Sequence, residues 1–388
     1  MRYNDSECDP EKGMAIFSDL IYNKPQKIMV LGPGCSAVTE TVAEAAKMWN
    51  LVVMSYGSTS PALSDRRKYK TFFRTVPSAG FHNPAYIRLL KHYGWQKIHI
   101  IYEAEKGFNS IVGNLEKLCE QNEIEVVTRQ SFLYDPTEAV RNLNRSDGGI
   151  IVGLFYETSA RLVFCEAYKN NLYGNRSIWL IDGSFANNWF KVDPGVTCTK
   201  DELQEALEGH LTLEPFNKNS PGVSTISGLT TEQFFKALEP RMTTRSRERA
   251  SYAEATLAYD AVWAIALALT KSIQVLAEFG KRLEDFTYSD EFTSQVIYNA
   301  TERTEFEGVS GRVSFTYEGD RIAETQIAQM QDGEYKILGC YNPNTDEIGW
   351  EDAVSLRTGG LMGNRQVTQR GFRETAIQFG INGLELPV

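Results

Sequence analysis

Apolar segments of strand length alternate with amphipathic segments of helical period along the first half of the chain, and this order constrains the fold most. The expected strands occupy residues 27–31, 51–57, 97–103, 124–132, 148–155 and 177–182, and the expected helices occupy residues 36–49, 83–95, 108–122, 135–146 and 158–171. Repeated strand–helix–strand units form parallel sheets with helices on both faces. The sequence therefore predicts an α/β fold.

The second half of the chain changes its period. Helical spacing continues over residues 230–242 and 254–273, whereas residues 311–341 alternate between apolar and polar. Turn signals at 318–320 and 332–333 divide that stretch, which predicts antiparallel hairpins. The 388 residues are enough for about two domains.

Composition and charge disfavour several classes of protein. The net charge of −10 disfavours nucleic acid as a partner. The most apolar stretch, residues 261–270, is shorter than a membrane span, and the polar opening of the chain lacks signal-peptide character. Four histidines and the absence of a Cys-x-x-Cys pair predict no zinc site, and we expect no cofactor.

Residues 32–36, Gly-Pro-Gly-Cys-Ser, join an expected strand to an expected helix. They lack the Gly-Lys-Ser/Thr ending of a phosphate loop and the third glycine of a dinucleotide fingerprint. The chain also lacks a Gly-x-Ser-x-Gly nucleophile elbow. Cys35 at a helix start is either an activated nucleophile or half of a disulfide, and we favour the disulfide. The sequence thus favours a binding protein over an enzyme.

Hydroxyl or aromatic side chains follow three expected strands, at the edge where parallel sheets bind ligands. Ser36 follows the first strand, residues 58–60 follow the second, and Tyr156 follows the fifth. Hydroxyls and free N–H groups at a helix start bind a carboxylate well. The alternative is that Ser36 is only an N-cap and that Tyr156 is part of the core.

Glycosylation signals and cysteines indicate an extracellular protein. Asn-x-Ser/Thr sequons occur at Asn4, Asn144, Asn175 and Asn299, and the six cysteines are well separated. Both features are typical of proteins that fold in an oxidising compartment.

Long stretches of the chain resemble the extracellular ligand-binding domain of the metabotropic type B GABA receptor family. They include GCSAVTETVAEAAKMWNLVVMSYGSTSPALSDR, GIIVGLFYETSARLVFCEAYKNNLYG and FEGVSGRVSFTYEGDRIAETQIAQM, and the resemblance extends from about residue 5 to residue 350. It is stronger to the agonist-binding subunit than to the partner subunit. It implies a two-lobe Venus flytrap, like the type I periplasmic binding proteins, that closes on an amino acid.

The resemblance also implies a division into lobes. We expect residues 1–76 and 210–306 in lobe 1, without the family's opening strand–helix–strand, residues 77–209 and 307–345 in lobe 2, and residues 346–388 as a tail or linker.

Four positions keep the polar residues that the family uses to hold its ligand. The resemblance implies that Ser36 and Thr59 hold the ligand carboxylate, that Glu254 binds the ammonium, and that Tyr156 approaches from lobe 2. The alternative for Glu254 is a favourable interaction with the dipole of its own helix.

Two positions in the walls of the expected site depart from the family. Val76 stands where the family has a histidine, and Ser184 stands where it has a tryptophan. The anchors for the charged groups are therefore kept while the packing around the ligand changes.

The resemblance implies which cysteines pair. The expected disulfides are Cys8–Cys35 and Cys165–Cys198, and a third bridge between Cys119 and Cys340 stays open.

We expect the chain to be part of a G-protein-coupled receptor on the extracellular side of the plasma membrane. Its expected partners are an amino acid such as GABA, a second receptor subunit, and a G protein contacted through a membrane domain absent from this chain. The alternatives are a partner subunit that acts through heterodimer contacts without binding agonist, a free-standing periplasmic-type binding protein, and, least favoured, an enzyme.

Overall fold

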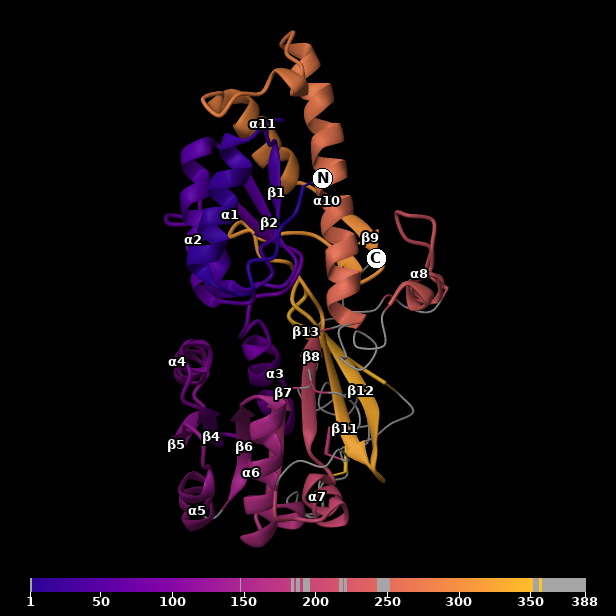
Figure 1. The fold of residues 1–388 in the computed structure, drawn as a ribbon. Coiled ribbons are helices and arrows are strands. Elements are labelled where there is room, and N and C mark those ends of the chain that lie inside the picture. The colour runs from indigo at the N-terminus through magenta and orange to yellow at the C-terminus, as the bar shows by residue number, and fades with distance from the viewer. Residues whose placement is uncertain are drawn as a thin grey trace, which may run out of the picture.

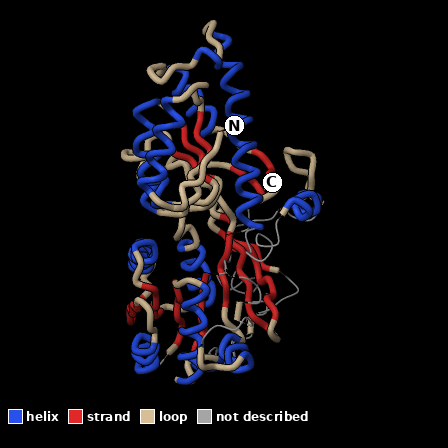
Figure 2. Tube along the Cα trace, viewed as in Figure 1, coloured by secondary structure: helices blue, strands red, loops and turns tan. Residues whose placement is uncertain are grey.

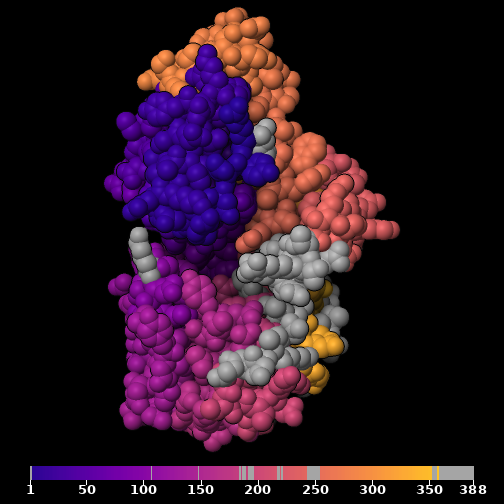
Figure 3. Space-filling model, in the orientation of Figure 1, coloured from indigo at the N-terminus to yellow at the C-terminus, as the bar shows by residue number. Residues whose placement is uncertain are grey.

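The computed structural model shows two α/β lobes stacked end to end (Figure 1). It describes residues 2–146, 148–182, 185, 189–190, 196–215, 219, 222–242, 252–351 and 356–357. The upper lobe combines the N-terminal segment with residues 252–302, and the lower lobe combines residues 83–215 with residues 325–350. Because each lobe is built from distant parts of the sequence, the chain crosses between the lobes more than once, and Figure 3 shows the indigo surface of the N-terminal segment above the magenta surface of the second lobe. This arrangement is that of a two-lobe Venus flytrap.

A parallel sheet of β1 (Met29–Leu31), β2 (Val52–Ser55) and β3 (Phe72–Arg74) forms the centre of the first lobe. One core joins it to α1 (Pro10–Tyr22) and α2 (Ser36–Ala46), and another joins it to α10 (Tyr252–Glu278) and α11 (Glu291–Glu302). All four residues of β2 are buried, as expected for a strand covered on both faces.

An eight-stranded sheet in the order β13-β12-β11-β8-β7-β6-β4-β5 forms the second lobe. The strands from β8 to β5 in that order are parallel, and β11, β12 and β13 are antiparallel. Their bounds are β4 (Lys97–Glu103), β5 (Glu125–Phe132), β6 (Gly149–Leu154), β7 (Ser177–Asp182), β8 (Leu211–Pro215), β11 (Thr325–Gln331), β12 (Glu334–Asn342) and β13 (Glu347–Trp350).

Helices cover both faces of this sheet, and Figure 2 shows them in blue around the red strands. α3 (Asn83–Tyr93) and α4 (Lys106–Gln121) belong to one core, whereas α5 (Thr137–Arg145), α6 (Glu157–Lys169) and α7 (Lys200–Leu207) belong to the other. The remaining elements are α8 (Thr231–Leu238), β9 (Phe306–Gly308), β10 (Gly311–Val313) and the 3₁₀ helices η1 (Lys47–Trp49), η2 (Pro61–Ser64), η3 (Gly174–Arg176), η4 (Glu239–Arg241) and η5 (Leu283–Asp285).

Local sequence signals set several element ends. α3 has Pro84 in its first turn and ends at Gly94, whose φ of 68° is the left-handed conformation of a C-cap glycine. The β11–β12 hairpin turns at Asp332 and Gly333, whose φ values of 57° and 77° match the turn that an Asp-Gly pair favours.

The positions of three strands differ from the expected lobe boundaries. β8 was expected in lobe 1, yet it pairs with β7 and β11 in the sheet of the second lobe. β10 was expected in lobe 2, yet Val313 packs in a core with Val52 and Met54 of the first lobe. β13 was expected in the tail, yet it pairs with β12. Contacts between segments far apart in the sequence decide the positions of all three strands, and local periodicity does not reveal such contacts. The other boundaries stay a prediction.

α10 is longer than the helix expected at residues 254–273, and its apolar segment is longer than residues 261–270. By length and composition, Glu254–Glu278 is able to cross a membrane, although such a helix is also typical of a soluble core. In this fold, α10 packs beside β1, β2 and α11, with Ala261 and Ala264 buried against the sheet. We therefore interpret α10 as a core helix of the first lobe.

Candidate functional site

Ser36 lies at the start of α2 but is not its N-cap. Cys35 occupies the N-cap position with extended backbone angles, and no side chain among the described residues caps this helix end. The simple N-cap alternative for Ser36 is therefore wrong. The Ser36 Oγ instead accepts a hydrogen bond from the backbone N–H of Ser60 at 3.1 Å. This bond brings the loops after β1 and β2 together at the uncapped start of α2.

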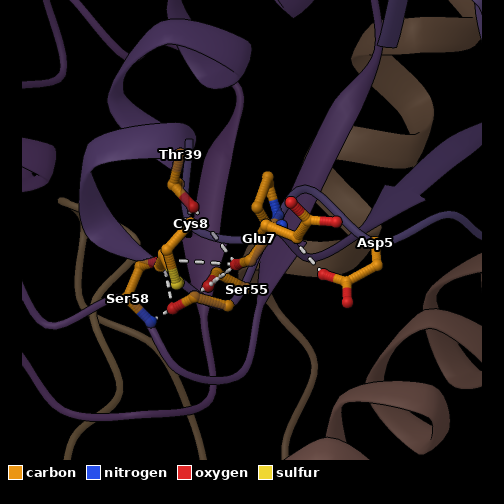
Figure 4. Close-up of a disulfide and its surroundings, with 9 residues drawn as sticks. Asp5, Glu7, Cys8, Thr39, Ser55 and Ser58 are labelled. Atoms are coloured by element: carbon orange, nitrogen blue, oxygen red, sulfur yellow. Dashed lines mark hydrogen bonds between the residues drawn. A yellow bond between two sulfur atoms is a disulfide. The ribbon is translucent and has the colours of Figure 1, made fainter. Parts of the chain in front are cut away.

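The loop before α2 is held by hydroxyls that converge on one carbonyl. Ser55, Ser58 and Thr39 donate to the Pro33 carbonyl oxygen at 2.6, 3.2 and 3.1 Å. Figure 4 shows these three side chains gathered beside Cys8. Ser58 is fully buried and also lies 2.7 Å from the Thr39 hydroxyl. Ser58 thus supports the loop and is not available to a ligand.

Thr59 faces solvent next to this buried serine. Its carbonyl accepts the N–H of Ala79 at 2.7 Å, which fixes the loop against the segment leaving β3. A Cβ on neighbouring Gly57 would lie 3.0 Å from the Gly34 carbonyl oxygen, so the two loops meet at backbone distance. The structure therefore places Ser36 and Thr59 on adjoining loops at the carboxyl edge of the first-lobe sheet.

Arg74 supports the same loop and was not anticipated from the sequence. Its fully buried guanidinium donates to the carbonyls of Ser58 and Ser60 at 2.8 and 2.9 Å, to the Ser64 hydroxyl at 2.9 Å and to the Asp320 carboxylate at 2.7 Å. Burial lowers the pKa of Arg74, while the charge of Asp320 opposes that shift. In the sequence, the one sign of this role is an arginine at the end of a short apolar segment.

Val76 and Glu254 lie in neighbouring segments. Thr75, just before Val76, donates its hydroxyl hydrogen to the Leu257 carbonyl of α10 at 2.9 Å. Glu254 is in the first turn of α10, one turn before Leu257, and it is exposed, while Val76 is half-buried. The expected ammonium-binding carboxylate thus stands on a helix that is tied to the segment containing Val76.

A buried polar cluster around Asp260 fixes α10 about two turns after Glu254. The Asp260 carboxylate accepts hydrogen bonds from the backbone N–H groups of Val309 and Ser310 at 3.0 and 2.8 Å, and from the Ser310 hydroxyl. Arg321 donates to the Ser310 hydroxyl at 2.6 Å and to the Thr75 carbonyl at 3.1 Å. Burial raises the pKa of Asp260 and lowers the pKa of Arg321 to about 10.

Tyr156 is at the N-cap of α6 on the second lobe, and about half of it is exposed. Its hydroxyl donates to Glu105 at 3.0 Å, its backbone N–H donates to Glu103 at 3.2 Å, and its ring meets Phe108 edge to face. The core alternative for Tyr156 is wrong, because the ring lies at the surface. Ser184 lies outside the described residues.

A cavity of about 540 Å³ lies where elements of both lobes meet. Pro61 and Ser64 line it from the first lobe, Asn114 lines it from α4, and Asp320 and Arg321 line it from the β10–β11 connection. The expected ligand residues do not line this cavity, so it adjoins their loops and is separate from the expected site.

The cysteines pair as expected. The Cα–Cα distance is 5.5 Å for the Cys8–Cys35 disulfide and 5.6 Å for the Cys165–Cys198 disulfide, while Cys119 and Cys340 are free. The first bridge connects the segment before α1 to the N-cap of α2, beside Ser36.

The four sequons differ in exposure. Asn4, Asn175 and Asn299 are exposed, whereas Asn144 is half-buried near the end of α5. Glycosylation at these sites stays a prediction, with Asn144 the least accessible.

The sequence matches the family described as "Receptor family ligand binding region" over residues 1–333. The chain belongs to this family. It is 46% identical over 349 residues to the gamma-aminobutyric acid type B receptor subunit 1 of Mus musculus, covering 90% of this chain and 36% of that relative. It is 41% identical to subunit 1 of Caenorhabditis elegans, covering 90% of this chain and 39% of the relative, and 34% identical to subunit 2 of Homo sapiens, covering 90% and 37%.

Identity to subunit 1 therefore exceeds identity to subunit 2, which confirms the expected resemblance. The chain spans little more than a third of the length of these relatives. These relatives are named as receptor subunits.

Proposed function

We propose that this chain is the ligand-binding region of a type B GABA receptor and that it holds a zwitterionic amino acid, GABA or a close relative, between its lobes. The observation that carries the proposal is the uncapped start of α2, where Ser36 and exposed Thr59 lie on adjoining loops. Backbone N–H groups and hydroxyls at a helix start favour a carboxylate.

Glu254 supplies the complementary charge in this proposal. It is exposed, and α10 is anchored two turns further on by Asp260. A ligand with its carboxylate at Ser36 and Thr59 and its ammonium at Glu254 satisfies both ends, and Tyr156 covers it when the second lobe closes.

The proposed setting follows from the relatives. Because they are named as receptor subunits, we propose that this chain acts extracellularly beside a second receptor subunit and signals through a G protein. Val76 favours a second candidate, a partner subunit that binds no agonist, because it puts an apolar side chain where the family has a histidine.

Calorimetric titration of the chain with GABA and with glutamate tests the proposal. We expect saturable GABA binding that weakens about ten- to hundred-fold in Glu254→Ala and in Ser36→Ala, because each variant removes a hydrogen bond to a charged group worth roughly 1.5–3 kcal/mol. The control is Glu278→Ala, at the exposed far end of the same helix, which should bind as the wild type does.

Absence of amino-acid binding by the wild type would favour the partner-subunit candidate. Val76→His is the decisive second variant. If it binds GABA and the wild type does not, the absence of binding in the wild type is due to this one position.

A further inference from the structure

Tyr156 is engaged by acidic residues of its own lobe. Glu103 ends β4, Glu105 precedes α4, and Phe108 lies in the first turn of α4. Glu105 accepts the phenol hydrogen, Glu103 accepts the backbone N–H, and Phe108 packs against the ring with centroids 4.9 Å apart. The segment 103–108 therefore sets the position of the Tyr156 side chain.

A phenol has one hydrogen to donate, so its hydroxyl serves one acceptor at a time as a donor. In this structure the acceptor is the Glu105 carboxylate at 3.0 Å. Burial and the bond to Glu105 raise the pKa of Tyr156, which keeps the hydroxyl protonated and able to donate. A ligand carboxylate that approaches Tyr156 must therefore replace Glu105 as the acceptor.

The replacement carries an electrostatic cost. A ligand carboxylate at the Tyr156 hydroxyl comes within a few ångströms of the Glu105 carboxylate, and like charges at that distance repel. Glu103, which accepts the backbone N–H of Tyr156, adds a second negative charge near this residue. A ligand with a neutral group in place of the carboxylate avoids this repulsion.

We propose that Glu105 is a positioning residue that sets the ligand preference of the site: it holds the Tyr156 hydroxyl in the unliganded arrangement and disfavours a ligand carboxylate on the second lobe. The proposal rests on the proposed function, since it assumes that Tyr156, on closure, reaches the carboxylate of an amino acid bound at Ser36 and Thr59. In this proposal, the ligand carboxylate replaces the Glu105 carboxylate as the acceptor of the Tyr156 hydroxyl hydrogen when the ligand binds.

The experiment compares two ligands by calorimetry, GABA and its neutral amide, 4-aminobutanamide. Glu105→Gln keeps an acceptor oxygen and removes the charge. We expect this variant to bind GABA about three- to tenfold more tightly than the wild type and to bind the amide with unchanged affinity. Added salt should reduce the difference in GABA affinity between the wild type and Glu105→Gln, because screening weakens the repulsion between the two carboxylates.

Two controls separate positioning from a general effect on the lobe. Glu120→Gln removes a carboxylate at an exposed position of α4 and should leave both affinities unchanged. In a Tyr156→Phe background, Glu105→Gln should lose most of its effect, because the two side chains act through one hydrogen bond.

The outcomes distinguish this inference from the proposed function. If the wild type binds GABA and Glu105→Gln changes neither ligand, or changes both equally, the positioning role of Glu105 is overturned while the proposed function stands. If neither the wild type nor Glu105→Gln binds GABA, both are overturned.

Discussion

Neighbouring hydroxyls have different roles in this site. Ser58 is fully buried and bonds to the Pro33 and Gly34 carbonyls and to the Thr39 hydroxyl, whereas Thr59 faces solvent. The sequence identified residues 58–60 as a group of hydroxyls after a strand. It could not tell which of them points inward, because that depends on the distant loop that each one meets.

Ser58→Ala should therefore destabilise the fold, while Thr59→Ala should weaken ligand binding. Removing the buried hydroxyl leaves its partners short of a hydrogen bond, at a cost of roughly 1–3 kcal/mol. Removing the exposed hydroxyl should change the free energy of unfolding by less than about 0.5 kcal/mol. Urea unfolding and GABA titration of both variants measure the two effects, and a large loss of stability in Thr59→Ala would contradict this assignment.

Two buried histidines should make the stability depend on pH. Burial lowers the pKa of His82 and of His210 from 6.5 to about 4. Between those values the unfolded chain binds more protons than the folded one, so the free energy of unfolding should be highest above pH 6.5 and fall as the pH drops toward 4. Each histidine contributes up to about 3 kcal/mol over that window.

The midpoints of urea unfolding at pH 7, 6 and 5 measure this loss of stability. His82→Gln and His210→Gln should each flatten the dependence. Burial also lowers the pKa of His92, although this residue is exposed, so His92→Gln should flatten the dependence to a smaller extent. An unchanged slope in both buried variants would contradict the account.

At the scale of elements, α10 depends on one buried charge. Asp260 is fully buried and holds the helix against residues 309–310, and Gly308 approaches it so closely that a side chain there would overlap the carboxylate. In the sequence Asp260 was only a charge before an apolar stretch. Its partners lie about 50 residues further on, beyond the reach of any local pattern.

Asp260→Ala should lower the free energy of unfolding by roughly 3–5 kcal/mol, because it removes an acceptor from three donors and leaves the charge of buried Arg321 without its counter-charge. Asp260→Asn keeps the shape and should cost less. Glu278→Ala, on the same helix, is the control and should be close to neutral. Thermal unfolding followed by circular dichroism gives the comparison, and equal midpoints for Asp260→Ala and Glu278→Ala would refute this role.

At the scale of the whole molecule, local sequence patterns predicted the main strands and helices of residues 27–57 and 83–182. They did not predict α1, β3, α7, β8 or α11, nor the assembly of the elements into lobes. The alternation of residues 27–182 predicted helix-covered parallel sheets, and both lobes have them. β8 and β13 were misplaced because sheet order depends on contacts between distant segments. The resemblance predicted Glu254 as a ligand residue and predicted the disulfide pairs. The roles of Arg74 and Glu105 depend on contacts that only the fold shows.

The central claim is that an amino acid binds at the facing edges of both lobes. Hydrogen–deuterium exchange of the chain with and without saturating GABA tests it directly, because closure on a ligand protects backbone amides near it. The account predicts slower exchange in peptides covering residues 34–40 and 57–60 of the first lobe and 154–158 of the second, with no change in α5. Unchanged exchange in all of these peptides, or protection confined to one lobe, would contradict it.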